Sequence, residues 1–361
     1  PRHPHPAADR RRREERNALL LLLPSFLIIL LIAIYPLSRV FYSSFTDERF
    51  ASATETRYVG LDNYRRLLSM TIREIPPVID NATGEVRRDE AGNVVLQNPR
   101  LFLRTLDTEL TFDAVTTFRL FGRNYVLGAS TPAFIRSIWD TLVFTVSSVT
   151  LETVLGMLIA LVLVSNFRGR GIMRAAMLVP WAIITVVSAR IWEWMLQPNR
   201  IGFFNTLLYD LGLSDGNFAF FQTAALQIPS MVMIDVWKTT PFMALLIMAG
   251  LTTIPKELYE AAQVDGASPL RRFFSITLPL LVPTLAVALI FRTLDALRVF
   301  DLFQVVLGDS RNSMASYAYY QLINARNVGM SSAASVVIFL VILIFAIFYI
   351  RALGVNRNGG E

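Results

Sequence analysis

Long apolar runs, separated by polar stretches, dominate the hydrophobic pattern of this chain. A helix needs about 20 predominantly apolar residues to cross the hydrocarbon core of a bilayer. Six runs approach or exceed this length, at residues 18–41, 139–164, 172–195, 228–251, 279–303 and 333–350. The pattern therefore predicts an all-α integral membrane protein with six transmembrane helices.

Basic residues in the short flanks indicate how these helices are oriented. Arginine and lysine accumulate before the first run, after the second, after the fourth and after the sixth, and the remaining short connections hold few. Because basic short loops stay in the cytoplasm, both termini are expected there. The chain divides into a basic cytoplasmic tail (1–17), a first transmembrane helix (18–45), a transmembrane core (132–355) and a second cytoplasmic tail (356–361). The first run is longer than a signal-peptide core and no small-residue cleavage site follows it, so a retained anchor helix is expected.

An insertion separates the first helix from the core. Residues 46–131 are too many for a simple connection. Turn-forming residues at 80–84 and alternating apolar residues at 93–96 favour a small external subdomain that contains strands. A poorly ordered insertion is the alternative. Farther along, apolar residues at helical spacing over 203–213 predict an amphipathic helix at the membrane interface.

Composition excludes several kinds of chemistry. The chain has no cysteine, and its two histidines, His3 and His5, lie in the N-terminal tail. Disulfides, cysteine nucleophiles and histidine-based metal sites or triads within the fold are therefore excluded, and no catalytic or metal-binding residue is predicted. The net charge of +6 does not indicate a nucleic-acid partner, because the arginines lie beside apolar runs and account for topology.

The connection between the fourth and fifth runs, residues 255–279, has clear helix boundaries. Pro255 is suited to open a helix and Gly266 to end it. Ser268 then suits the cap of a second helix that starts at Pro269. Two short helices at a right angle are therefore expected on the cytoplasmic side.

The same stretch carries the most specific motif of the chain. It holds Glu260-Ala261-Ala262, then Gly266 after three residues and, nine residues later, Ile276-x-Leu278-Pro279. This arrangement resembles the EAA loop of permease subunits of binding-protein-dependent ABC importers. In that family the loop is a coupling helix that sits in a cleft of the ATPase subunit. The resemblance assigns this docking role to Glu260, Ala261, Ala262 and Gly266, and the small side chains suit a closely approaching partner.

Other stretches extend the resemblance. Residues 59–64, 166–174 and 180–183 look like those of sugar permeases, and residues 235–243 and 291–296 look like those of trehalose or maltose importers in particular. The resemblance covers nearly all of the chain except residues 70–129. It implies the type I ABC importer permease fold. The external insertion between helices one and two is not part of the resemblance, because relatives of the trehalose type usually have a shorter segment there.

The resemblance also implies an assembly in the cell membrane of a bacterium or archaeon. Its expected partners are a second permease subunit, two ATPase subunits, an extracytoplasmic solute-binding protein, membrane lipid and a disaccharide such as trehalose or maltose. This chain contains no Gly-x-x-x-x-Gly-Lys-Ser/Thr phosphate loop. No cofactor is therefore expected in this chain, and ATP and Mg²⁺ are expected in the ATPase subunits.

Ionisable residues inside the fourth and fifth runs mark a candidate solute site. Charges within a span are costly and usually face an internal cavity. Asp235 and Lys238 lie three residues apart, as do Arg292 and Asp295, and helix rise places both pairs roughly 20 to 24 Å from the cytoplasmic edge. Hydrogen-bonding groups beside an aromatic face suit a carbohydrate. The candidate contacts, which resemblance to maltose-type permeases places at the same level, are Asp235, Lys238, Thr239, Phe242, Arg292 and Asp295.

Alternatives to this interpretation stay open. Asp235–Lys238 and Arg292–Asp295 can also be interpreted as structural ion pairs, because buried charges often pair to offset the cost of desolvation. Glu152 in the second run is expected to bond a neighbouring helix. For the whole chain, the favoured hypothesis is a sugar permease subunit of an ABC importer. The alternatives are an ion-coupled secondary sugar transporter, although no inverted repeat is visible, and a membrane enzyme that uses carboxylates.

Overall fold

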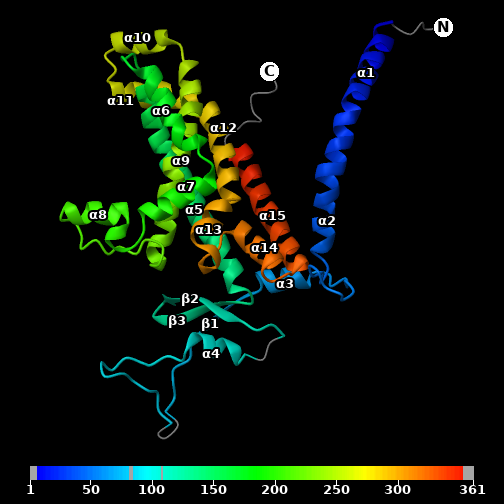
Figure 1. The fold of residues 1–361 in the computed structure, drawn as a ribbon, viewed down its shortest axis with the longest axis vertical. Helices are drawn as coiled ribbons and strands as arrows, with labels where there is room; N and C mark the ends of the chain where they lie inside the picture. The colour runs from blue at the N-terminus through cyan, green and yellow to red at the C-terminus, as the bar shows by residue number, and fades with distance from the viewer. Residues whose placement is uncertain (1–5, 81–83, 107–108, 353–361) are drawn as a thin grey trace.

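The computed structural model describes residues 6–80, 84–106 and 109–352, so that the predicted tail at 356–361 and both histidines lie outside it. A bundle of long helices makes up most of the described chain, with a small sheet beyond one end (Figure 1). Among the described residues, five helical segments are long and apolar enough to cross a membrane, and a bent pair makes a sixth. With the bent pair counted as one span, the predicted six-helix class is confirmed.

The first span consists of α1 (Pro6–Ile29), a π-helical turn (Leu30–Ile34) and α2 (Tyr35–Ser43). Its most apolar window is not buried at all within this chain, and Figure 1 shows α1 standing apart from the other helices. Only the far end of the span touches the bundle, where Phe41 on α2 packs edge-on against Phe339.

The remaining spans form the bundle itself. Their helices are α5 (Pro132–Val164), α6 (Arg170–Ala182), α7 (Thr185–Met195), α9 (Ala224–Thr252), α12 (Leu278–Leu297) and α15 (Val328–Ala352). Shorter helices connect them: α8 (Phe203–Asp210), α10 (Lys256–Val264), α11 (Pro269–Arg272), α13 (Asp301–Val306) and α14 (Met314–Ile323). The end of the bundle that carries α10 and α11 is the loop end, and the opposite end, beside the sheet, is the sheet end. The start of α1 and the end of α15 both lie at the loop end (Figure 1).

Two predicted spans differ from the structure. The predicted continuous helix at 172–195 is wrong, because α6 and α7 meet at an angle of 91° across the extended residues Ile183 and Ile184. Pro180 in the last turn of α6 lacks a backbone N–H and crowds the preceding turn, which favours a break there. The predicted helix at 279–303 ends early, at Leu297, so that Arg298 lies at the helix cap and α13 follows as a separate element.

Close packing of α5 against α9 forms the centre of the bundle. Gly156 on α5 lies so near α9 that a Cβ added there would meet the Ala244 backbone nitrogen at 3.1 Å. Small residues let membrane helices approach in this way. Apolar layers lie on both sides of the bundle's midpoint. The layer nearer the sheet end includes Phe144, Met231 and Phe303, and the layer nearer the loop end includes Met157, Met243, Ile247 and Leu281.

An ion pair joins three elements near the sheet end. Arg311, in the connection before α14, donates to both carboxylate oxygens of Asp140 on α5, at 2.6 and 2.7 Å. The same guanidinium donates to the Ala224 carbonyl at the start of α9, at 2.8 Å. This Asp140–Arg311 clamp therefore ties α5, α9 and the α14 connection together.

The segment between α2 and α5 folds around a three-stranded antiparallel sheet. Its strands are β1 (Met70–Glu74), β2 (Asp113–Leu120) and β3 (Arg123–Ala129), in the order β1-β3-β2. Phe121 and Gly122 both have positive φ, as a two-residue hairpin turn requires. The helix α3 (Asp62–Leu68) precedes β1 in sequence, and α4 (Pro99–Arg104) lies between β1 and β2. The alternation at 93–96 does not form a strand of this sheet and makes only isolated bridges within the described residues.

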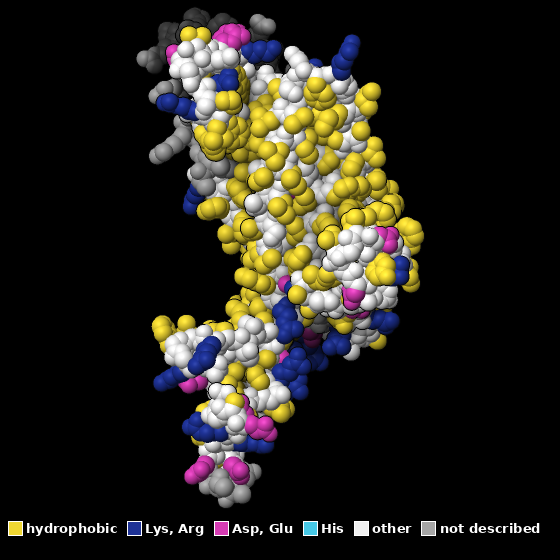
Figure 2. Space-filling model, turned by 90° about the vertical axis from the view of Figure 1, so that its left-hand side faces the viewer, with side chains coloured by type: hydrophobic (Ala, Val, Ile, Leu, Met, Phe, Trp, Pro, Cys, Tyr) yellow, Lys and Arg dark blue, Asp and Glu magenta, His cyan; other side chains and the backbone are white. Residues whose placement is uncertain are grey.

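Charge and apolarity are unevenly distributed over the surface. Figure 2 shows a face of the bundle covered largely by hydrophobic side chains, whereas charged side chains gather toward the sheet end and over the sheet segment. This distribution fits a multi-pass membrane protein, in which lipid covers the apolar helices and water covers the charged ends.

Candidate functional site

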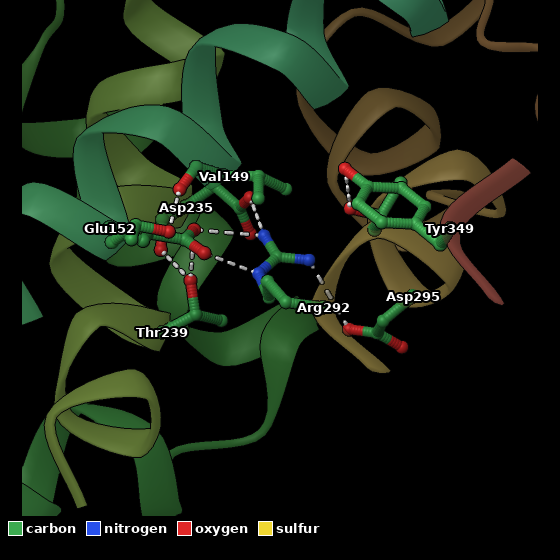
Figure 3. Close-up of polar contacts among 9 residues, drawn as sticks. Val149, Glu152, Asp235, Thr239, Arg292, Asp295 and Tyr349 are labelled. Carbon is green, nitrogen blue, oxygen red and sulfur yellow. Dashed lines mark hydrogen bonds and ion pairs between the residues drawn. The ribbon is translucent and has the colours of Figure 1, made fainter. Parts of the chain in front are cut away.

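A buried arginine lies at the centre of the polar residues inside the bundle. Arg292 on α12 is 3% exposed, and Glu152 on α5 is fully buried. The guanidinium donates from Nε to Glu152 Oε2 at 2.5 Å and from Nη2 to Glu152 Oε1 at 2.9 Å. Nη2 also donates to Asp235 on α9, and Nη1 lies 3.5 Å from Asp295 on its own helix. Three spans therefore meet at one guanidinium (Figure 3).

Thr239 completes this group from one turn farther along α9. Its hydroxyl lies 2.5 Å from Glu152 Oε1 and 2.6 Å from the Asp235 carbonyl oxygen. Since a hydroxyl carries one proton, it donates to one of these oxygens at a time. The residues Glu152, Asp235, Thr239, Arg292 and Asp295 are called the Arg292 cluster below.

The Arg292 cluster carries a large electrostatic cost and a compensating set of bonds. Removing a guanidinium and two carboxylates from water costs several kcal/mol per ion even after relaxation. The five N–H donors of arginine suit two carboxylates at once, and such charge-assisted bonds are about twice as strong as neutral ones. The cluster is therefore stable only while its partners stay in place.

The structure contains one of the two predicted ion pairs, because Arg292 Nη1 lies 3.5 Å from Asp295, and it replaces the other. Asp235 bonds Arg292 on the neighbouring helix, and Lys238 forms no ion pair with any residue that the structure describes. The expected equal level of the two sets agrees with this contact, in which Asp235 and Arg292 touch directly. Asp295 alone extends outward, 58% exposed, and meets Arg298 at 3.4 Å.

Sequence analysis did not place Glu152 at this site. It predicts only that Glu152 bonds a neighbouring helix, whereas the structure makes it the main partner of Arg292. The signal was present, because Glu152 is a carboxylate in the middle of an apolar run and Arg292 is a cation in another. The pairing itself depends on the packing of α5 against α12, which hydropathy does not report.

Phe242 presents an aromatic face one turn beyond Lys238. Its ring stacks on Trp181, with centroids 5.7 Å apart and planes within 8° of parallel. Trp181 is 46% exposed and lies at the end of α6, immediately before the 91° bend. The bend thus places a second aromatic ring beside the candidate residues, and sequence analysis did not include Trp181 among them.

The predicted helix boundaries at the loop end agree with the structure. The helix α10 ends at Val264, and Gly266 takes the left-handed φ of +76° expected after a helix end. The Ser268 side chain accepts a bond from the Arg271 backbone N–H, and Pro269 opens α11. The docking candidates Glu260, Ala261 and Gly266 are exposed, and Ala262 is half-buried.

The same loop is both fastened to the bundle and uncovered on its far side. Tyr259 on α10 hydrogen-bonds Thr277 at the base of α12 through their hydroxyls, at 2.9 Å. On the uncovered side, Val264 is 88% exposed and Leu270 is 69% exposed. Both side chains lie on the same loop as the four docking candidates.

One groove in the bundle is not lined by any residue of the Arg292 cluster. A groove of about 900 Å³ lies between α5 and α9, with Trp139, Trp192 and Trp237 among its lining residues. None of the six candidate solute contacts lines it. Its lining is mostly apolar, but Ser147 and the clamp residues Asp140 and Arg311 also belong to it.

Comparison with known proteins identifies the chain. The family described as "binding-protein-dependent transport system inner membrane component" matches residues 152–355. This chain belongs to that family. The resemblance read from the loop at 255–279 is thereby confirmed, and the chain is a permease subunit of an ABC importer rather than an enzyme or an ion-coupled transporter.

Several relatives carry descriptions of their own transport systems. The "trehalose/maltose transport system permease protein MalF" of Thermococcus litoralis is 46% identical over 235 residues, which cover 63% of this chain and 78% of the relative. The "trehalose transport system permease protein SugA" of Mycobacterium tuberculosis is 42% identical over 226 residues, covering 61% and 70%. The "sulfoquinovosyl glycerol transport system permease protein SmoG" of Agrobacterium fabrum is 36% identical over 232 residues, covering 63% and 74%.

A solved structure extends the likeness to nearly the whole chain. A chain of a bacterial ABC transporter involved in the import of alginate superposes with a TM-score of 0.67 at 20% identity. The match covers 97% of this chain and 99% of that chain. At this identity the match concerns the fold alone.

Proposed function

We propose that this permease subunit conducts a disaccharide such as trehalose or maltose and binds it beside the Arg292 cluster. Relatives at 42–46% identity are described as permeases for these sugars. The observation that carries the proposal is the polar group at the meeting point of α5, α9 and α12. Phe242, which stacks on Trp181, follows Thr239 by three residues on α9 and therefore lies near the same face of that helix.

The candidate residues divide into two roles in this proposal. Lys238, Phe242 and Asp295 keep exposed or half-exposed side chains and contact the solute. The aromatic ring covers one sugar face, and the charged groups bond its hydroxyls. Asp235, Thr239 and Arg292 form the wall behind them, and their own mutual bonds hold that wall in place.

A binding measurement tests the sugar site. Labelled trehalose and maltose are equilibrated with the purified complex without its solute-binding protein, so that the permease site alone contributes. Loss of one charge-assisted hydrogen bond between Asp295 and the sugar lowers the binding free energy by about 1.4 kcal/mol or more. Asp295→Ala is therefore expected to weaken binding about tenfold. Arg190→Ala, in an exposed pair with Glu193 on α7, is the matched control. Equal affinity in D295A and wild type contradicts the assignment.

We propose that α10 docks on a separate ATPase subunit through Glu260, Ala261, Ala262 and Gly266, with Val264 and Leu270 as apolar anchors. ATP and Mg²⁺ are then bound by the two ATPase subunits, and a second permease subunit completes the path. Glu260→Ala or Gly266→Val is expected to uncouple ATP hydrolysis from uptake while the solute-binding protein still binds sugar. Glu257→Gln, on the same helix, is the control, and unaltered uptake in both test variants contradicts the docking role.

We propose that the loop end faces the cytoplasm and the sheet end faces outward, where a solute-binding protein delivers the sugar, in a bacterial or archaeal cell membrane. The positive-inside pattern supports this orientation. The chain lacks cysteine, so single cysteines report sidedness without interference. A membrane-impermeant thiol reagent is expected to label Arg119→Cys in intact cells and Gln263→Cys only after permeabilisation, and the reverse pattern contradicts the orientation.

A further inference from the structure

Glu152 has no contact with solvent and lies one layer behind the proposed sugar contacts. It is the most deeply buried carboxylate of the Arg292 cluster, with 0% exposure against 14% for Asp235 and 58% for Asp295. It therefore does not touch a solute directly. Any part that it plays in recognition acts through Arg292.

The contact of Glu152 with Arg292 is bidentate. One carboxylate oxygen takes Nε at 2.5 Å and the other takes Nη2 at 2.9 Å. Two parallel bonds fix both the position and the plane of a guanidinium, whereas a single bond leaves it free to turn. With Nε and Nη2 held, Nη1 points toward Asp295, 3.5 Å away (Figure 3).

Charge balance does not require this second carboxylate. One acid, Asp235, already neutralises the guanidinium from the neighbouring helix, and burying another acid adds a desolvation cost. Apolar layers on both sides of the cluster also contribute to the packing of the helices. Glu152 therefore contributes the orientation of the guanidinium, and the Thr239 hydroxyl lies 2.5 Å from its Oε1, within hydrogen-bond distance.

We propose that Glu152 is a positioning residue for solute recognition. It holds the Arg292 guanidinium so that Nη1 and the Asp295 carboxylate form a fixed polar edge against which the sugar hydroxyls bind. This inference rests on the proposed sugar site. It adds a specificity-determining residue on α5, a helix that contributes no direct sugar contact.

The test compares two substitutions in the assembled complex. Glu152→Gln presents an amide N–H₂ to the N–H donors of Arg292 and breaks the two-point contact, whereas Glu152→Asp keeps the charge and both acceptor oxygens one methylene farther back. Sugar affinity is measured by equilibrium binding without the solute-binding protein, and uptake is measured with saturating sugar-loaded binding protein. E152Q is expected to weaken sugar binding about tenfold, more than it lowers maximal uptake, and E152D to restore a substantial part of the affinity.

Matched variants separate the outcomes. Asp140→Asn, in the Asp140–Arg311 clamp, is expected to leave sugar affinity unchanged. Wild-type affinity in E152Q, or failure of both E152Q and E152D to assemble, overturns the inference, because Glu152 is then without effect or purely structural. If D295A weakens binding and E152Q does not, the inference fails while the proposed site stands. If neither variant weakens binding, the proposed site itself fails.

Discussion

Arg292 and Arg311 both pair with carboxylates of α5, and their surroundings differ. In the Asp140–Arg311 clamp one acid meets one arginine, and the remaining partners, the Ala224 carbonyl and Gln227, are neutral. In the Arg292 cluster two buried acids share one arginine, and a third acid extends outward. In the clamp the charges of Asp140 and Arg311 neutralise each other, as expected for a structural ion pair. The cluster has more carboxylates than are required to neutralise Arg292. Such an excess is expected where a site also binds a solute.

The comparison predicts the largest effect at Arg292. Arg292→Leu leaves Glu152 and Asp235 buried side by side without a cation, and removing one partner of a buried ion pair typically costs 3–5 kcal/mol. The R292L complex is expected to lose most of its assembled fraction, measured by co-purification and by the melting temperature in detergent. A fully assembled R292L complex of wild-type melting temperature would show that the cluster does not hold the helices together.

A smaller effect is expected at the clamp. Asp140→Asn leaves Arg311 charged, but its side chain is 26% exposed and still bonds the Ala224 carbonyl. The loss of stability is therefore expected to be about 1–3 kcal/mol, lowering the melting temperature without changing sugar affinity. If D140N weakened sugar binding as strongly as D295A, the clamp would belong to the solute site and the contrast between the two arginines would disappear.

The smallest stability effect is expected at Asp235. Asp235→Asn leaves one arginine and one buried acid, and the amide oxygen still accepts from Nη2. We expect a stability change below about 1 kcal/mol, smaller than that of D140N although Asp235 is nearer the bundle centre. A melting temperature lower in D235N than in D140N would mean that the cluster needs both acids for stability, and the positioning role of Glu152 would lose its main support.

Much of this fold follows from patterns that act locally along the chain. The apolar runs predict the spans because bilayer thickness sets their length. Pro269 and Gly266 predict the ends of the loop helices because their backbone preferences act within one turn. The motif at 255–279 could likewise predict the family, because all its residues lie within one short stretch of sequence.

The features that sequence analysis missed depend on contacts between distant segments. The hydropathy pattern does not distinguish a straight helix from α6 and α7 bent at 183–184, because both arrangements keep the same residues in lipid. Asp235 was paired in sequence with Lys238, three residues away, but helix packing offered it Arg292 instead. The sheet strands carry mixed polar and apolar residues on a partly exposed surface, so that their alternation gave little signal.

A structure of the assembled complex with trehalose bound tests the central claim most directly. The account predicts a sugar ring against Phe242 and Trp181, with hydroxyls bonded to Lys238 and Asp295, in front of an intact Glu152–Arg292 contact. A sugar lodged instead in the groove of Trp139, Trp192 and Trp237, with the Arg292 cluster untouched, would contradict it.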